Sequence, residues 1–240
     1  MEPQEQIEQK ENNVKKPSAI STPAAIITAG VIIAAALIFK GGGTKTISNI
    51  KDQQKIAPTE KVSLRENDYV RGDISKAEVV VIEYSDSDCP FCERFHTTMK
   101  DLLSQYGTKV AWAYRYFPLS IHPNANNEAI ALECVGSLGG NDAFWKYLDE
   151  VISITVSPEK SKATLSSVAN GIGIDKNLFE SCIANPDIAK KITDQSTEAQ
   201  SLGAQGTPYS IAINKKGEQE VIPGALPIEQ LKPIIDRLLK

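Results

Sequence analysis

The feature that most constrains the fold is the position of Cys89-Pro90-Phe91-Cys92 between two patterns of different period. Residues 78–84 form a nearly continuous apolar run rich in β-branched residues, which is typical of a strand covered on both faces. Residues 93–106 carry apolar side chains at helical spacing, and Gly107 supplies a helix stop. A second strand pattern follows at residues 109–117. The sequence therefore predicts a strand, a helix that opens at the cysteines, and a second strand.

The remainder of the chain predicts how this unit is completed. Residues 122–203 contain several consecutive helical patterns and no convincing strand. Strand patterns return at residues 209–213 and 220–222, separated by a turn that ends at Gly217, and residues 227–239 form a last helix. We therefore expect one α/β domain over residues 68–240, with a β-α-β half, an all-helical insertion and a β-β-α half.

The segments before this domain have a different composition. Residues 1–18 are rich in charged and amide side chains and cannot form a core, which predicts a disordered tail. Residues 19–39 contain no charged side chain, and as a helix they are long enough to cross a membrane. Residues 40–67 lack a sustained apolar period and are predicted to be a linker.

A cleaved signal peptide is the alternative for residues 19–39. Its apolar region is typically about 7–15 residues long and ends in small residues, whereas residues 34–36, all Ala, lie inside this apolar stretch. We therefore expect a retained single-pass anchor in the cell membrane. Lys15 and Lys16 favour a cytoplasmic tail and an extracytoplasmic domain, although Lys40 reduces this charge bias.

The overall charge argues against a nucleic-acid partner. The chain has 26 basic and 30 acidic residues, a net charge of -4, and no long run of Lys and Arg. A surface that binds the phosphate backbone needs such clustered positive charge.

The predicted chemistry depends on the place of the cysteines at the start of a helix. Pro90 suits the first helical position, and the free N–H groups and dipole at that end stabilise an anion. A Cys89 thiolate would be such an anion, which lowers the pKa of the thiol and makes it reactive. We predict that Cys89 is the exposed nucleophile and that Cys92, one turn further on, is the protected resolving thiol.

Two other roles for this pair remain as alternatives. Cys89, Cys92 and His96 have spacing that could form part of a zinc site, but the other potential ligands, His122, Cys134 and Cys182, are distant in sequence. We therefore expect no metal. A purely structural disulfide between Cys89 and Cys92 would close too short a loop to add much stability.

Several segments together resemble the DsbA-like family of thiol-disulfide oxidoreductases, over about residues 68–239. The segments that carry the resemblance are residues 81–92 with Phe95 and His96, Gly206-Thr207-Pro208, Phe144-Trp145, and residues 221–224. The resemblance implies a thioredoxin fold with a helical insertion. It also implies that Pro208 is a cis-proline that faces the cysteines, whereas an ordinary turn proline is the alternative.

The resemblance implies further site residues. Pro90, Phe91, Thr207 and Pro208 would contact the substrate, and the start of a strand at Pro208 would offer an unpaired backbone edge to an extended chain. Glu83 stands where the family places a buried carboxylate beneath the resolving cysteine. Burial would raise its pKa and allow it to exchange protons with that thiol. A solvent-facing residue at the strand end is the alternative.

One departure from the family pattern concerns charge at the active site. Phe91 occupies the position where the best-known oxidants commonly have a histidine, so a very strongly oxidising potential is in doubt. His96 and His122 are the only histidines in the chain. His96 lies on the active-site helix, and we predict a packing role for it rather than a tuning role.

Cys134 and Cys182 lie in different predicted helices of the insertion. Free thiols are a hazard in an oxidising compartment, so we predict a structural disulfide between them. A second redox pair and two separately buried thiols remain as alternatives.

These features predict a dithiol oxidase that donates disulfides to exported proteins and needs no bound cofactor. The resemblance suggests that an integral-membrane, quinone-linked thiol oxidase regenerates it. A disulfide isomerase or reductase is the alternative within the same chemistry. A tethered binding or holdase module, in which the thiols have no catalytic role, is the alternative from another class.

Overall fold

The structure is a computed structural model of the 240-residue chain, and it describes residue 58, residues 60–153 and residues 162–240. These residues belong to one unit, residues 54–240. The predicted tail and membrane helix, and most of the predicted linker, lie outside the described residues. Within the described ranges, no helix has both the length and the apolar character that crossing a membrane requires.

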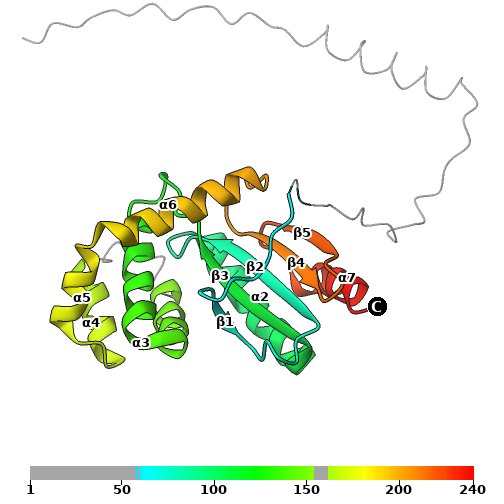
Figure 1. The fold of residues 1–240 in the computed structure, drawn as a ribbon, viewed down its shortest axis with the longest axis horizontal. Helices are drawn as coiled ribbons and strands as arrows, with labels where there is room; N and C mark the ends of the chain where they lie inside the picture. The colour runs from blue at the N-terminus through cyan, green and yellow to red at the C-terminus, as the bar shows by residue number, and fades with distance from the viewer. Residues whose placement is uncertain (1–57, 59, 154–161) are drawn as a thin grey trace, which may run out of the picture. The chain divides into compact units, whose positions relative to one another are not determined.

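A five-stranded mixed sheet forms the centre of the unit (Figure 1). Its strands are β1 (Tyr69–Arg71), β2 (Val79–Ser85), β3 (Val110–Tyr116), β4 (Tyr209–Asn214) and β5 (Gln219–Pro223). They lie in the order β1-β3-β2-β4-β5. The pair β2 and β3 is parallel, and the other neighbouring pairs are antiparallel. The central strands β2 and β3 are almost wholly buried, which explains why they are apolar without alternation.

Helices cover both faces of the sheet. They are α2 (Pro90–Tyr106), α3 (Ala125–Ser153), α4 (Lys162–Gly171), α5 (Lys176–Ile183), α6 (Pro186–Ser201) and α7 (Ile228–Leu238), and a short 3-10 helix, η1, covers Gly107–Lys109. One core lies between the sheet and α2, α3 and α7, and it includes Phe95, Trp112 and Ile235. A second core lies on the opposite face, where Ala199 and Leu202 pack near Ile82. The predicted thioredoxin-type arrangement with a helical insertion is confirmed.

The insertion is held together by a disulfide, and its helix α3 contains a sharp turn. Cys134 of α3 and Cys182 of α5 form a disulfide with an S–S distance of 2.07 Å, which is the pairing expected from sequence. The helical backbone of α3 is interrupted at Gly140, where φ is 77°. Glycine adopts this left-handed conformation without the steric cost that a side chain adds.

The N-terminal boundary of the domain differs from our prediction. Val62, placed in the linker by sequence, is buried and exchanges two hydrogen bonds with Gln219, of 3.1 and 2.7 Å. Strand β1 was not predicted at all. Three residues are too short to show a period, and they become a strand only because β3 supplies their hydrogen-bond partners.

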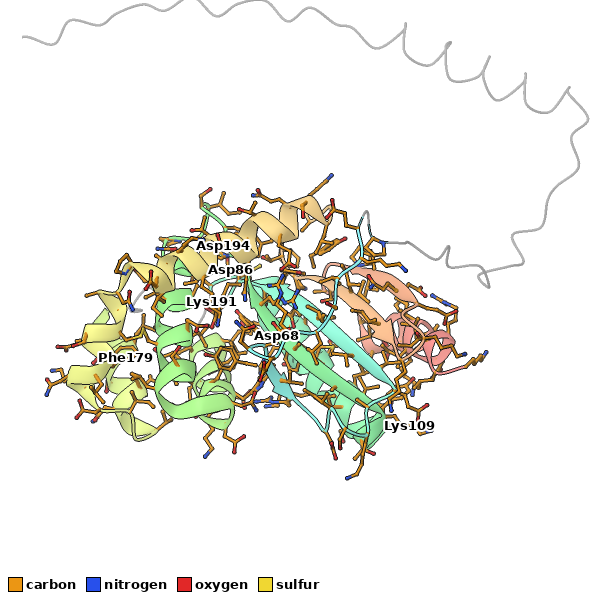
Figure 2. The ribbon with its side chains drawn as sticks, in the orientation of Figure 1. Asp68, Asp86, Lys109, Phe179, Lys191 and Asp194 are labelled. Carbon is orange, nitrogen blue, oxygen red and sulfur yellow. A yellow bond between two sulfur atoms is a disulfide. The ribbon has the colours of Figure 1, made fainter. Side chains whose placement is uncertain are left out.

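A buried arginine explains why this N-terminal segment stays in place. Arg115 of β3 is fully buried and donates two hydrogen bonds to Asp68 (Figure 2), at 2.9 and 2.7 Å. It also donates to the Ser63 carbonyl, the Tyr84 hydroxyl and the Glu198 carboxylate. A buried charge is tolerated only when it is paired and fully hydrogen-bonded, as this one is.

Candidate active site

The helix α2 begins at the two cysteines, as the sequence predicts. Cys89 is the N-cap residue with extended backbone angles, and Pro90 occupies the first helical position. The Glu93 N–H donates to the Cys89 carbonyl at 3.1 Å, which closes the first helical turn. Both Cys89 and Cys92 are free thiols. The unpaired N–H groups of this first turn therefore surround the Cys89 side chain.

The exposure of Cys89 contradicts our expectation. We predicted an exposed nucleophile, but only 2% of Cys89 is accessible, and Cys92 is fully buried. The Cys89 Sγ lies 3.7 Å from the carbonyl oxygen of Thr207, so the loop before β4 covers it. Pro90 and Phe91 are the exposed members of the motif, and 53% of Phe91 is accessible. A substrate would therefore meet these two side chains before it reaches the Cys89 sulfur.

The surroundings of the two thiols shift their pKa values in opposite directions. The hydrogen bond from the Cys92 thiol, with others from Thr207 and the Phe91 and Cys92 N–H groups, lowers the pKa of Cys89 to about 5 against the effect of burial. Burial is the main reason that the pKa of Cys92 lies well above its ordinary value, and the negative charges on Cys89 and Glu83 add to it. A neutral Cys92 thiol thus donates to a Cys89 thiolate at physiological pH.

Thr207 can interact with both protonation states of Cys89. A protonated Cys89 thiol donates to the Thr207 carbonyl, which favours the neutral form. The buried Thr207 hydroxyl is engaged by no oxygen or nitrogen atom of the described residues, so it can donate to the Cys89 thiolate, and this interaction helps to lower the pKa of Cys89. Hydrogen bonds to an ionised acceptor are roughly twice as strong as neutral ones, so Thr207 favours the thiolate.

Glu83 lies on β2 beneath the cysteines and is 1% exposed, which excludes the solvent-facing alternative. Burial raises the pKa of Glu83 to about 7, although the indole N–H of Trp112 donates to its Oε2 at 2.8 Å and opposes that rise. The Glu83 charge in turn raises the pKa of Cys92. The carboxyl group can therefore change its protonation state near neutral pH, beside a thiol that must gain or lose a proton.

The peptide bond between Thr207 and Pro208 is cis. A pocket of about 350 Å³ lies along this loop, lined by residues of the segment 203–209 together with Pro223 and Gly224. One expectation here is wrong, because β4 is not an edge strand and pairs with both β2 and β5. The backbone that a substrate could approach is therefore confined to the loop that precedes Pro208.

Sequence reasoning missed two acidic residues in the turn before Cys89. Asp86 (Figure 2) is buried and accepts hydrogen bonds from His122 Nδ1 at 2.7 Å and from the Leu119 N–H at 2.9 Å. Asp88 is nearly buried and accepts from the Asn124 N–H at 2.9 Å. Their place in a short loop between a buried strand and the cysteines was the only signal of this role.

The other histidine packs away from the cysteines. His96 is buried on α2, its Nε2 lies 2.7 Å from Asp149 Oδ1, and its ring contacts the Trp112 ring edge-on. This is the packing role that we expected. The described part of the chain contains no group of three or more His, Cys, Asp or Glu side chains arranged to hold a metal ion.

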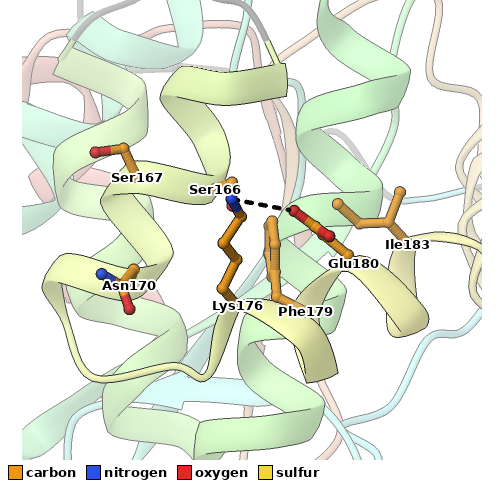
Figure 3. Close-up of a pocket in the computed structure, with 7 residues that line it drawn as sticks. All are labelled: Ser166, Ser167, Asn170, Lys176, Phe179, Glu180 and Ile183. Carbon is orange, nitrogen blue, oxygen red and sulfur yellow. Dashed lines mark ion pairs between the residues drawn. The ribbon is translucent and has the colours of Figure 1, made fainter.

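A larger pocket lies elsewhere, between α4 and α5 of the insertion (Figure 3). It has a volume of about 610 Å³, and the ion pair of Lys176 and Glu180, at 3.8 Å, lies along it. Its lining includes Phe179 but no cysteine or histidine.

Residues 65–237 match the sequence profile of the thioredoxin family. The chain belongs to this family. The matched residues include both cysteines, Glu83 and the loop with the cis-proline.

Solved structures with the same fold are DsbA-type proteins and related oxidoreductases. α-DsbA1 of Wolbachia pipientis gives a TM-score of 0.64 at 21% identity, over 73% of this chain and 92% of that one. DsbA2 of Pseudomonas aeruginosa gives 0.59 at 26% identity, over 74% and 97%. A thioredoxin-like oxidoreductase from Silicibacter pomeroyi gives 0.60 at 24%, over 72% and 92%. The fold is thus that of DsbA-type thiol-disulfide oxidoreductases.

Curated relatives carry a different name. The chain is 28% identical over 172 residues to the Na(+)/H(+) antiporter NhaA 1 of Mycolicibacterium vanbaalenii, and 31% identical over 144 residues to that of Salinispora arenicola. These matches cover 68% and 60% of this chain but only 27% and 21% of the antiporters. The chain therefore spans about a quarter of the length of these relatives, and the likeness concerns that segment.

Proposed function

We propose that this protein exchanges disulfides with other proteins through Cys89 and Cys92, acting chiefly as a dithiol oxidase. The observation that carries the proposal is that the pKa of Cys89 is lowered while the pKa of Cys92 is raised. Exchange requires a thiolate that attacks or leaves easily and a second thiol that is held in reserve.

The oxidase reaction starts from a disulfide between Cys89 and Cys92. A substrate thiolate attacks the Cys89 sulfur, a mixed disulfide forms, and Cys92 leaves and takes up a proton. Glu83 can supply that proton, because its pKa of about 7 lets it carry one at neutral pH. A second substrate thiolate then attacks the substrate sulfur of the mixed disulfide and releases the Cys89 thiolate. Two electrons pass from the substrate dithiol to the cysteine pair.

The low pKa of Cys89 favours this direction of electron flow. At pH 7 a thiol with a pKa of about 5 is ionised, which stabilises the reduced pair by about two pKa units. That is roughly 3 kcal/mol, or about 60 mV towards a more oxidising potential. The helix terminus and the hydrogen bonds to Cys89 provide this effect without a histidine at position 91.

We further propose where in the cell the reaction takes place. The uncharged segment 19–39 would anchor the chain in the cell membrane and place the domain on the extracytoplasmic side, where newly exported proteins are the substrates. A membrane quinone-linked thiol oxidase would return the pair to its disulfide form. The membrane part is tested by fractionation: the chain should stay in the membrane pellet after a salt wash and be open to external protease. Recovery of a shortened, freely soluble form would contradict it.

The exchange activity is tested with the oxidised full-length chain and a reduced, unfolded protein substrate. The wild type should form substrate disulfides in a stoichiometric amount, and Cys89→Ser should form none. The matched control is Cys134→Ser with Cys182→Ser, which removes the other two cysteines and should retain the activity. Equal substrate binding by wild type and Cys89→Ser, without exchange by either, would instead identify a tethered binding module.

A further inference from the structure

Two buried carboxylates connect the active-site turn to the loop between β3 and α3. Asp86 accepts hydrogen bonds from the Asp88 N–H within the turn and from the Leu119 N–H and His122 Nδ1 across it. The Asp86 carbonyl also accepts from the Cys89 N–H at 3.1 Å. The residue that carries the nucleophile is therefore fixed directly to Asp86, and Asp86 is fixed to the opposite loop.

The negative charge of Asp86 disfavours a thiolate nearby. Its side chain is fully buried, and a buried negative charge beside Cys89 would oppose ionisation of the thiol. Among the described residues, His122 faces Asp86 with a titratable positive charge, at 2.7 Å, and 18% of that side chain is accessible. A protonated His122 cancels the Asp86 charge, whereas a neutral His122 leaves the carboxylate uncompensated.

The charged groups around His122 are all negative when ionised. Asp86, Asp88 and Cys89 face it from the active-site turn, and Glu128 of α3 is bound to the same turn through the Ser87 hydroxyl at 2.7 Å. Partial burial lowers the pKa of His122, but the hydrogen bond to Asp86 and these charges outweigh burial and raise it. A cation at this position is thus favoured by every charged neighbour.

We propose that His122 acts as the electrostatic partner of the active-site thiolate, through its ion pair with Asp86. It is a positioning residue, since it sets the ionisation of Cys89 through Asp86 and touches no substrate atom. The inference rests on the proposed exchange function and supplies a cation that the Cys-Pro-Phe-Cys motif itself lacks. The exposed Arg94 is a second cation near the motif, but its guanidinium lies over the Phe91 ring, 4.5 Å from the ring centre.

Coupling between two sites is reciprocal, and this gives a test that needs no variant. If the His122 cation stabilises the Cys89 thiolate, then the thiolate must raise the pKa of His122 by the same amount. With two histidines in the chain, NMR titration of the full-length protein can follow both in the oxidised and the reduced form. The His122 pKa should be higher in the reduced form, by about one unit if the charges act at short range. An identical His122 pKa in both redox forms would overturn the proposal.

A pair of variants separates charge from structure. His122→Asn keeps an N–H donor near the position of Nδ1 but carries no charge, so it should raise the pKa of Cys89 by the shift seen for His122. In Asp86→Asn with His122→Asn the uncompensated carboxylate is also gone, and the pKa of Cys89 should return towards the wild-type value. A purely structural role predicts no shift in His122→Asn, and that result would refute the inference. A wild-type Cys89 pKa near 8.5 would instead refute the proposed function itself.

Discussion

Replacing Glu83 by Gln should make the protein more stable, and increasingly so as the pH rises. Glu83 is buried, and its pKa of about 7 in the folded state exceeds its ordinary value of 4.5. Below pH 4.5 the carboxyl group is protonated whether the chain is folded or not, so it contributes nothing. Between pH 4.5 and 7 only the unfolded chain releases the proton, and the free energy of unfolding falls by about 1.36 kcal/mol per pH unit.

Above pH 7 Glu83 is ionised in the folded chain as well, and its burial lowers the free energy of unfolding by the full amount. The 2.5-unit difference between these pKa values amounts to about 3 kcal/mol. The neutral amide introduced by Glu83→Gln has no such penalty, and its oxygen can still accept from the Trp112 N–H. The gain of Glu83→Gln over wild type should therefore be about 3 kcal/mol larger at pH 8 than at pH 4.5.

The assay is chemical denaturation of the oxidised full-length chain at both pH values, because a disulfide between Cys89 and Cys92 removes the thiols from the titration. Glu78→Gln is the matched control, since Glu78 precedes the same strand and is exposed. The Glu83→Gln gain is compared with the Glu78→Gln effect at each pH. A Glu83→Gln gain that is the same at pH 4.5 and pH 8 would refute the assignment of a buried, titrating carboxyl group.

Three further variants test separate parts of the structure. Cys134→Ser with Cys182→Ser opens a loop with a sequence separation of 48 residues. The double variant should lower the free energy of unfolding by about 4 kcal/mol and the Tm by about 8–16 °C, while disulfide exchange continues. An unchanged Tm would contradict a structural disulfide. Cys92→Ala should accumulate mixed disulfides through Cys89 in cells under oxidising conditions, seen on non-reducing gels, and failure to trap any substrate would argue against the mechanism. Arg115→Met leaves buried Asp68 without its cation and should lower the free energy of unfolding by about 3–5 kcal/mol, so a near-neutral effect in denaturation would show that this ion pair adds little.

Local patterns were enough to predict the elements that surround the cysteines. The apolar run of β2 is continuous because helices cover both faces of the sheet. After Cys89 the apolar residues follow a helical spacing, because one side of α2 packs on the core. Strand β1 could not be predicted in this way, since its three residues become a strand by pairing with β3, which lies much later in the chain.

The site was predicted less completely than the fold. Cys89 and Cys92 follow from the motif at the start of a helix, and Glu83 follows from the resemblance to the DsbA-like family. The burial of Cys89 could not be predicted, because it depends on a loop that lies 118 residues further on, at Thr207. The function of Asp86 depends on His122, which lies 36 residues away. A sequence shows that Asp86 is a loop residue, and only the folded chain shows which cation it meets.

The central claim is that the Cys89 thiol is held as a thiolate and so drives exchange. Ultraviolet absorbance of the thiolate, followed against pH in the reduced full-length chain, measures this directly. We expect one thiol to ionise near pH 5, and we expect that transition to disappear in Cys89→Ser, because Cys92 has a strongly raised pKa. A single transition near pH 8.5, the value of an ordinary thiol, would contradict the account.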